Sequence, residues 1–351
     1  MLEKDILKAI EVIKSYDYIG SYDEMNKYSR IYQNTTENIR GYMPYLDGNY
    51  KTALLPTSSG DHQLEAILNG ISEITCYDIN RFARYFTELK FCAIKNLTLD
   101  EYKYFMYEDM LNLDIFSHIK ADLTEEIIYF WEEIFKNCDI ENIRRRLFWY
   151  LGCDTETSYI KGVEFSKYSS ENFTSYLEKD NYKLVQERIH KTNIEYIESN
   201  ISEFSKILDK KYDLINLTNI YEFVNNGVFF NGDIEFTNYF KNSIPYLNDN
   251  GKVLITYLYK CSLDDIKKYK NKPLSYARLL GVFENTKLAT IYDRVKDEKD
   301  KRTTMDKLYA FRNVQLLRHM KELDIKSYEI PETRLGCGRG NKDLVLIYQK
   351  K

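Results

Sequence analysis

Between residues 51 and 95 the apolar positions change period twice, which predicts a strand, a helix and a second strand. Residues 52–56 form a short apolar run that stops at a polar turn, Thr57-Ser-Ser-Gly-Asp61. Apolar residues then recur at helical spacing, and a second apolar run, residues 74–77, ends on Asp78. In a doubly wound sheet the carboxyl ends of parallel strands face one crevice, where nucleotide-like ligands bind. The turn and Asp78 are therefore predicted to face the same ligand.

This turn differs from the dinucleotide-binding fingerprint. It has one glycine, Gly60, which lets the backbone come close to a ligand, where G-x-G-x-x-G has three, and no Walker lysine follows. A pyrophosphate ligand needs the denser glycine cradle, whereas a nucleoside without phosphates, such as S-adenosylmethionine, needs less. Ser58, Ser59 and Asp61 could hold an amino-acid end by hydrogen bonds and charge, and the carboxylate of Asp78 is placed to accept hydrogen bonds from ribose hydroxyls. A purely structural turn fits the same pattern equally well.

The rest of the pattern divides the chain into four parts. We expect a helical N-terminal cap over residues 1–50, the first part of an α/β domain over 51–95, a helical insertion over 96–182 and the remainder of the α/β domain over 183–351. Further strands are predicted at 193–197, 212–218, 252–257, 328–330 and 344–348. Helices are predicted at 2–10, 82–94, 99–106, 123–135, 143–151, 201–208, 236–247 and 262 to about 302. A turn is predicted at 248–251, and 293–302 is predicted to be a mobile, solvated loop.

Five strands with intervening helices and a terminal hairpin fit the seven-stranded sheet of the class I S-adenosylmethionine-dependent methyltransferases. The predicted fold class is thus a Rossmann-like α/β fold with a helical insertion and a helical N-terminal cap. In the insertion, an apolar stripe around Trp131 indicates a helix packed in the core, with contact to lipid or an apolar substrate as the alternative. We expect the insertion to pack on the α/β domain and to form part of the acceptor pocket.

The composition limits the kinds of binding partner that we expect for this protein. A net charge of -4 and a pI of about 5.8 give no electrostatic case for nucleic acid. The six cysteines include no C-x-x-C pair and indicate reduced thiols in a cytoplasmic protein. Without a long uncharged apolar stretch, membrane contact is expected to be peripheral at most. Because no two histidines have metal-ligand spacing, no metal is predicted.

His62, in the first helical turn, is interpreted as a capping or packing residue, with a catalytic base as the alternative. The tyrosines near the N-terminus pack on the sheet or close over the ligand.

Four blocks of the chain resemble the S-adenosylmethionine:diacylglycerol aminocarboxypropyltransferases, which begin betaine-lipid synthesis in bacteria. They are Tyr77–Asn80, Glu88–Lys90 with Ala93 and Ile94, Leu99–Tyr102 with Phe105, and Asn216–Glu222. The similarity covers roughly residues 50–107 and 193–260. It implies S-adenosylmethionine as co-substrate and a small-molecule or lipid acceptor, of which diacylglycerol is the least transferable element.

The resemblance also implies roles for individual residues. Asp78 and Asn80 would hold the ribose side, Asn200 and Ile201 the adenine, and the turn the methionine end. Asn219, Tyr221 and Glu222 would face the sulfonium, with Glu222 as candidate base or, alternatively, an exposed helix carboxylate. The expected binding residues are Thr57, Ser58, Ser59, Gly60, Asp61, Asp78, Asn80, Asn200, Ile201 and Asn219. Arg339, in a glycine-rich loop over 336–340, is either a partner for the ligand's carboxylate or a solvated arginine.

Three functional hypotheses follow. The first is an aminocarboxypropyl transferase, which the four blocks favour. The second is a methyltransferase, which is the commonest activity of the fold. The third is a non-catalytic nucleotide-binding or scaffold protein, against which Asp78 and the polar residues Asn219, Tyr221 and Glu222 argue. The sequence does not identify the acceptor or the oligomeric state.

Overall fold

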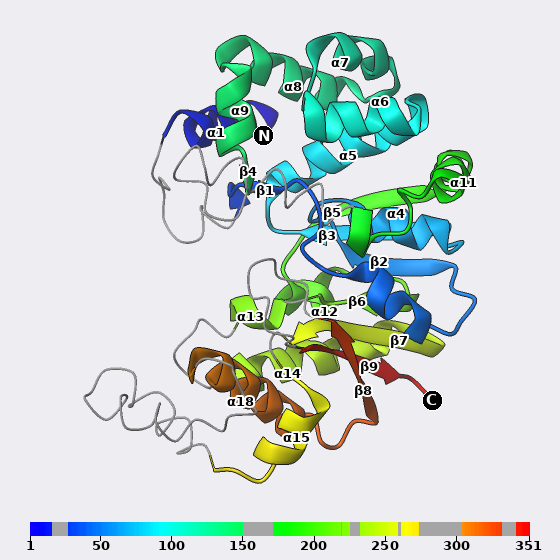
Figure 1. Ribbon diagram of the computed structural model, residues 1–351, viewed down its shortest axis with the longest axis vertical. Coiled ribbons are helices and arrows are strands. Elements are labelled where there is room, and N and C mark those ends of the chain that lie inside the picture. Colours follow the sequence, from blue (N-terminus) through cyan, green and yellow to red (C-terminus); the bar gives the residue numbers. More distant parts are fainter. Residues whose placement is uncertain are drawn as a thin grey trace. The chain divides into compact units, whose positions relative to one another are not determined.

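The computed structural model describes residues 1–15, 27–149, 171–218, 220–224, 232–258, 261–273, 304–331 and 342–351 (Figure 1). They divide into two compact units. The first comprises Met1–Arg40 and Asp47–Asn200, and the second comprises Gly41–Leu46 and Ile201–Lys351.

The first unit contains three parallel strands, β2 (Thr52–Pro56), β3 (Glu73–Asp78) and β5 (Asn193–Glu198), in the order β5-β3-β2. Helix α4 (Asp61–Leu68) links β2 to β3, and α5 (Arg81–Asn96) follows β3. Both crossovers run in the same direction across the sheet, so right-handed connections place their helices on the same face. The predicted strands and the helices after them are confirmed, and the carboxyl ends of β2 and β3 lie side by side.

The described part of the insertion is mostly helical, with one short strand at residues 148–149. Its elements are α6 (Leu99–Lys103), a π-helical turn (Tyr104–Glu108), α7 (Leu113–Ile119), a 3-10 turn (Lys120–Asp122), α8 (Glu125–Asn137) and α9 (Ile140–Arg146). These helices lie beyond α5 from the strands of this unit (Figure 1). Helix α11 (Lys179–Ile189) then contacts α4 and α5 and leads into β5.

One predicted helix, over 143–151, is wrong in its second half. Helix α9 ends at Arg146, and the next residues form β4 (Phe148–Trp149), which pairs in parallel with β1 (Ile31–Tyr32). Residues 147–149 are apolar or aromatic and so fit the apolar face of a helix as well as a strand. Only the partner strand, more than 100 residues earlier in the chain, decides between the two.

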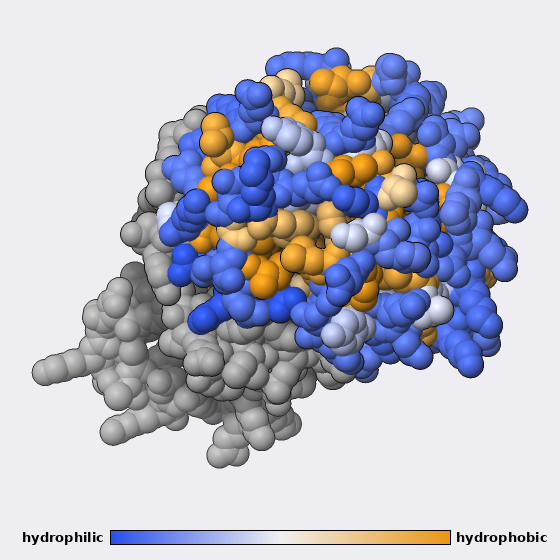
Figure 2. All heavy atoms as spheres, turned by 90° about the horizontal axis from the view of Figure 1, so that it is seen from above, coloured by the Kyte–Doolittle hydropathy of each residue, from blue (hydrophilic) through white to orange (hydrophobic). Residues whose placement is uncertain are grey.

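The apolar stripe on α8 belongs to the core. Ile127, Phe130, Trp131 and Ile134 are fully buried. The ring of Phe130 stacks on Tyr85 of α5 with centroids 3.9 Å apart, and the indole Nε1 of Trp131 donates to the Tyr85 carbonyl oxygen at 3.2 Å. In the view onto this side of the molecule, apolar side chains alternate with polar ones over the surface (Figure 2).

The N-terminal helix α1 (Leu2–Lys14) is tied to α5 by a buried carboxylate. Asp5 is fully buried and accepts hydrogen bonds from Arg81 Nε and Nη2, both at 2.8 Å, from Tyr85 at 2.8 Å and from Tyr28 at 3.2 Å. Tyr28 therefore takes the packing role rather than closing over a ligand. Residues 28–50 are mostly irregular, with α3 (Ile39–Tyr42) and a 3-10 turn (Met43–Tyr45) besides β1. Among the described residues of the predicted helical cap, α1 is thus its one long helix.

The second unit contains four strands in the order β6-β7-β9-β8. They are β6 (Tyr212–Asn216), β7 (Leu247–Leu258), β8 (Ile325–Pro331) and β9 (Lys342–Gln349). β6 and β7 are parallel, whereas β9 runs antiparallel to both β7 and β8. The predicted turn over 248–251 lies within β7 as an irregularity, because the register with β6 passes from Tyr212↔Leu247 to Leu214↔Lys252.

Helices accompany these strands. They are a 3-10 turn (Ile201–Glu203), α12 (Phe204–Ile207), α13 (Ile220–Val224), α14 (Gly232–Ser243), a 3-10 turn (Ile244–Tyr246), α15 (Leu263–Tyr269) and α18 (Thr304–His319). Helix α14 contacts both α13 and α18. The seven sheet strands of the described chain, parallel except for the final hairpin, confirm the predicted Rossmann-like α/β fold of the class I methyltransferases. The predicted loops over 293–302 and 336–340 lie outside the described residues.

Candidate functional site

The turn between β2 and α4 is held in an unusual backbone conformation. Ser58 has a φ of 44° and Gly60 a φ of 82°. The amide of Gly60 donates to the Thr57 carbonyl at 2.9 Å, and the amide of Ser58 donates to Asp78 Oδ2 at 2.9 Å. A left-handed conformation at a residue other than glycine costs free energy and is enriched at functional sites. The Ser58 hydroxyl makes no hydrogen bond to the part of the protein that the structure describes.

Asp78, at the end of β3, is held by the backbone around it. Its half-buried carboxylate accepts hydrogen bonds from the amides of Ser58 and Asn80, both at 2.9 Å, and from the amide of Ile79. Burial raises the pKa of Asp78, and these hydrogen bonds oppose the rise. Since a carboxylate offers about four acceptor positions, the three amides leave one for a further donor such as a hydroxyl. Asp78 therefore keeps one acceptor position for the predicted hydrogen bond from a ribose hydroxyl.

Asn80 was expected on the ribose side, and its side chain has other partners in the structure. Its Oδ1 accepts from the Phe82 amide at 3.1 Å, which makes Asn80 the N-cap of α5. Its Nδ2 donates to the carbonyls of Ser29 at 3.1 Å and Arg30 at 3.3 Å. Asn80 therefore fastens the N-terminal segment beside Asp78.

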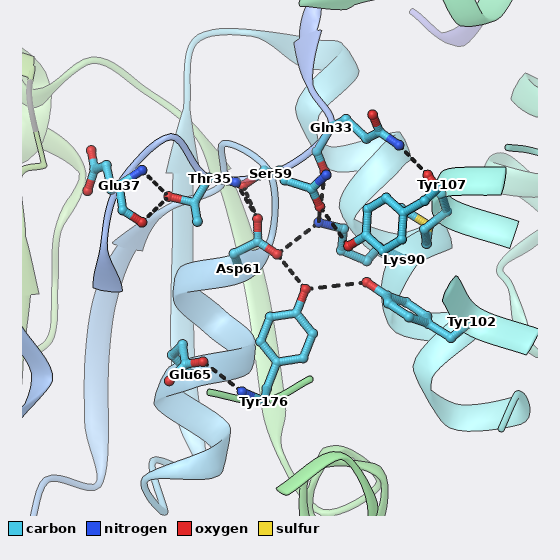
Figure 3. A network of polar contacts seen from close by, with 12 residues as sticks. Gln33, Thr35, Glu37, Ser59, Asp61, Glu65, Lys90, Tyr102, Tyr107 and Tyr176 are labelled. Atoms are coloured by element: carbon cyan, nitrogen blue, oxygen red, sulfur yellow. Dashed lines mark hydrogen bonds and ion pairs between the residues drawn. The ribbon is translucent and has the colours of Figure 1, made fainter. Parts of the chain in front are cut away.

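Asp61 was expected to contact the ligand, but its carboxylate is fully buried and fully used (Figure 3). Each oxygen accepts two hydrogen bonds. The donors are Lys90 Nζ at 3.0 Å and the Tyr176 hydroxyl at 2.7 Å to Oδ1, and the Ser59 hydroxyl at 2.7 Å and the Thr35 amide at 2.5 Å to Oδ2. All four acceptor positions are filled. Asp61 and Ser59 therefore stand behind the turn and hold it, rather than facing a ligand.

Lys90 is a site residue that sequence analysis did not select. Its side chain is fully buried, and its ammonium also donates to the carbonyl of Gln33 at 2.9 Å and to Asn34 Oδ1 at 3.4 Å. Burial lowers the pKa of Lys90, and the Asp61 carboxylate opposes this. Tyr107 donates to the same Asn34 Oδ1 at 3.1 Å (Figure 3). A lysine on the apolar face of a predicted helix was the signal that marks this position.

Packing against α5 also favours a glycine at position 60. A Cβ at this position would lie 3.2 Å from Thr87 Cγ2 and 3.5 Å from Lys90 Cδ, both on α5. The sequence-based reason for this glycine, room for a ligand, therefore has a competing explanation. The positive φ gives a second reason, because it strains any residue with a Cβ.

Two further buried acids lie on or against α4. Glu65 Oε1 accepts from the Tyr176 amide at 2.8 Å and from the Ser175 amide, and burial raises the pKa of Glu65 to about 7. The Nε2 of His62 lies 3.3 Å from Glu37 Oε2, and both side chains are buried. This arrangement agrees with the interpretation of His62 as a packing residue.

The remaining candidates are dispersed. Asn200 is exposed just after β5, in the first unit. In the second unit, Ile201 is buried, and Tyr221 is buried with its hydroxyl donated to Asp233. That hydroxyl is thus used within the protein core. Asn219, the Glu222 side chain and Arg339 lie outside the description.

The described residues contain neither a cluster suited to a metal ion nor a helix suited to crossing a membrane. No group of three or more histidine, cysteine, aspartate and glutamate side chains there could hold a metal ion. Within the same residues, every helix is too short or too polar to cross a bilayer.

Comparisons with known proteins add only distant likenesses. No protein-family model and no curated protein matches the chain. Among solved structures, N-methyltransferase NodS from Bradyrhizobium japonicum WM9 with S-adenosyl-L-homocysteine is 7% identical, with a TM-score of 0.36 over 99% of this chain and 98% of that one. O-methyltransferase TomG from Streptomyces achromogenes with S-adenosylmethionine is 6% identical, with a TM-score of 0.33 over 100% and 89%. A methyltransferase from Pyrococcus furiosus is 10% identical, with a TM-score of 0.32 over 99% and 97%.

Proposed function

We propose that this protein is an S-adenosylmethionine-dependent transferase that binds its co-substrate at the carboxyl ends of β2 and β3. The observation that carries the proposal is the pairing of Asp78 with the strained turn. The Ser58 amide donates to Asp78 at 2.9 Å while Ser58 keeps a φ of 44°. Strain that the surrounding structure maintains at a crevice of this fold is typical of a ligand site.

Within this site the side chains take separate roles. Asp78 accepts a hydrogen bond from a ribose hydroxyl at its remaining acceptor position. Ser58, in the turn after β2, is proposed for the methionine end, and Asn200, exposed just after β5, for the adenine. Asp61, Ser59 and Asn80 support the site without touching the ligand. Asn219 and Glu222, which follow β6, are retained as acceptor-side residues on the resemblance alone.

For the transferred group we propose the aminocarboxypropyl moiety, on the strength of the four sequence blocks. Bound S-adenosylmethionine supplies a cationic sulfur with three activated carbons and a neutral thioether as leaving group. The protein has to place one of these carbons in line with the acceptor and to receive the acceptor's proton. Aminocarboxypropyl transfer leaves methylthioadenosine, whereas methyl transfer leaves S-adenosylhomocysteine. Accumulation of S-adenosylhomocysteine during turnover with cell extract would assign methyl transfer instead.

The binding proposal is tested by replacing the strand-end carboxylate. Asp78→Asn should weaken binding of S-adenosylmethionine about 10- to 100-fold, since a hydrogen bond to a charged group contributes roughly 1.5–3 kcal/mol. Glu73→Gln is the matched control, because Glu73 is exposed at the opposite end of the same strand and should leave the affinity unchanged. The measurement is isothermal titration calorimetry. No heat of binding to the wild-type protein, or equal affinity in a folded Asp78→Asn variant, would contradict the proposal.

A further inference from the structure

Residues 27–37, here termed the strap, run along the carboxyl ends of all three strands of the first unit. At one end, Lys27 Nζ lies 3.1 Å from Glu198 Oε1, on the last residue of β5. In the middle, the carbonyls of Ser29 and Arg30 accept from Asn80, just after β3. At the other end, the Thr35 amide donates to Asp61, just after β2. The strap thus borders the edge of the sheet where the co-substrate is proposed to bind.

One buried ion pair contacts three successive residues at the far end of the strap, beside the separate contacts of Gln33 with the Met106 carbonyl and of Asn34 with Tyr107. Lys90 Nζ is 3.0 Å from Asp61 Oδ1, and neither side chain is exposed. Lys90 holds the strap through the Gln33 carbonyl and Asn34, and Asp61 holds it through the Thr35 amide (Figure 3). The ion pair therefore binds three successive strap residues: Lys90 contacts Gln33 and Asn34, and Asp61 contacts Thr35.

The same pair also holds the turn that faces the proposed ligand. The Ser59 hydroxyl donates to Asp61 Oδ2 at 2.7 Å, on the oxygen that also accepts from Thr35. Ser59 directly follows Ser58, whose amide fixes Asp78. Asp61 consequently joins the strap to the turn through one carboxylate oxygen. A movement of the ion pair would therefore displace the strap and the turn together.

We propose that Asp61 and Lys90 are positioning residues of the transferase: their ion pair holds the strap and the turn in the conformation that binds S-adenosylmethionine. This inference rests on the proposed function. Neither residue touches the ligand, because both are fully buried and every acceptor position of Asp61 is taken. Removing one member of a buried ion pair leaves an unpaired buried charge, whereas removing both charges leaves none. The pair's stabilising and positioning roles can therefore be separated.

The test compares Lys90→Met with the double variant Asp61→Asn/Lys90→Met. The single variant should lose melting temperature, and the double variant should regain most of it. In the ligand-free double variant, amides of residues 33–35 should exchange hydrogen at least tenfold faster than in the wild type, while core amides of β2 and β3 keep their protection. Its dissociation constant for S-adenosylmethionine should rise at least tenfold. The matched control is Arg84→Met/Glu88→Gln, which removes a partly exposed pair from the same helix together with the contact of Arg84 to Glu126. It should change neither the exchange of the strap amides nor the dissociation constant.

The outcomes distinguish the two proposals. Wild-type affinity together with unchanged strap exchange in the double variant would overturn the positioning role. Faster strap exchange with unchanged affinity would also overturn it, because the strap would then be irrelevant to binding. Failure of the wild-type protein to bind S-adenosylmethionine would instead overturn the proposed function, whatever the strap does. If the double variant does not fold, Ser59→Ala keeps both charges and cuts the link to the turn. Wild-type affinity in that variant would count against the inference.

Discussion

Replacing Gly60 by alanine tests why the turn after β2 needs a glycine. Gly60 and Gly70 have nearly the same backbone conformation, with φ of 82° and 88°. Alanine at either position pays roughly 1–2 kcal/mol for the left-handed conformation, partly offset by about 0.4–1 kcal/mol from the reduced freedom of the unfolded chain. The two sites differ in what the new methyl group meets, so the pair isolates the packing cost.

Of the two positions, only Gly60 has neighbouring atoms that a new methyl group would crowd. A Cβ at Gly60 would lie 3.2 Å from Thr87 Cγ2 and 3.4 Å from Phe91 Cε1, whereas a Cβ at Gly70 meets nothing within 4 Å. Overpacking a filled interior typically costs about 1–3 kcal/mol. We therefore expect Gly60→Ala to lower the free energy of unfolding by about 1–3 kcal/mol more than Gly70→Ala.

Urea denaturation of both variants gives the two free energies, and calorimetry gives their affinities for S-adenosylmethionine. Equal destabilisation of the two variants would refute the packing argument. A Gly60→Ala variant with the stability of Gly70→Ala but a large loss of affinity would restore the sequence-based explanation, in which the glycine makes room for a ligand.

Two further predictions concern buried carboxylates. Because burial raises the pKa of Glu65 from 4.5 to about 7, its contribution to stability is fully present below pH 4.5 and is lost as pH rises through 7. The loss is about 3 kcal/mol at 1.36 kcal/mol per pKa unit, and Glu65→Gln should remove this pH dependence from urea denaturation between pH 5 and pH 8. Asp5→Asn should cost about 1.5–3 kcal/mol, since it removes a buried charge that accepts hydrogen bonds from Arg81, while Arg81 keeps its pair with Glu198. Lys8→Met, which removes a partly exposed partner of Glu11, should cost less than about 1 kcal/mol in the same assay.

The sequence predicted β2 and β3 of the first unit because these two strands are buried on both faces. They read as short continuous apolar runs, and the polar turn that ends each run favours a strand over a longer helix. Helix α18 was missed for the opposite reason. It buries Arg312, Asn313 and Gln315, so polar residues interrupt the apolar periodicity that identifies a helix. A helix whose buried face is polar becomes visible only with its tertiary partners.

The candidate site was predictable only as far as local sequence extends. The turn and Asp78 could be found because each directly follows a strand in the sequence. The partners of Asp61 could not be found, since Thr35, Lys90 and Tyr176 lie 26, 29 and 115 residues away. An aspartate beside a glycine in such a turn has the same appearance whether it binds a ligand or an internal ammonium group. Burial alone separates the two.

The sequence blocks that suggested an aminocarboxypropyltransferase acquire a physical meaning in this network. Lys90 comes from the second block and Tyr102 from the third, and both reach Asp61: Lys90 directly and Tyr102 through the Tyr176 hydroxyl at 3.4 Å. These contacts describe how residues of two blocks support the turn and the strap. The network of contacts says nothing about the reacting carbon. It does not select among the three carbons of the sulfonium, so the resemblance weighs more for the architecture of the site than for the group transferred. The nucleoside by-product is therefore the measurement that decides the chemistry.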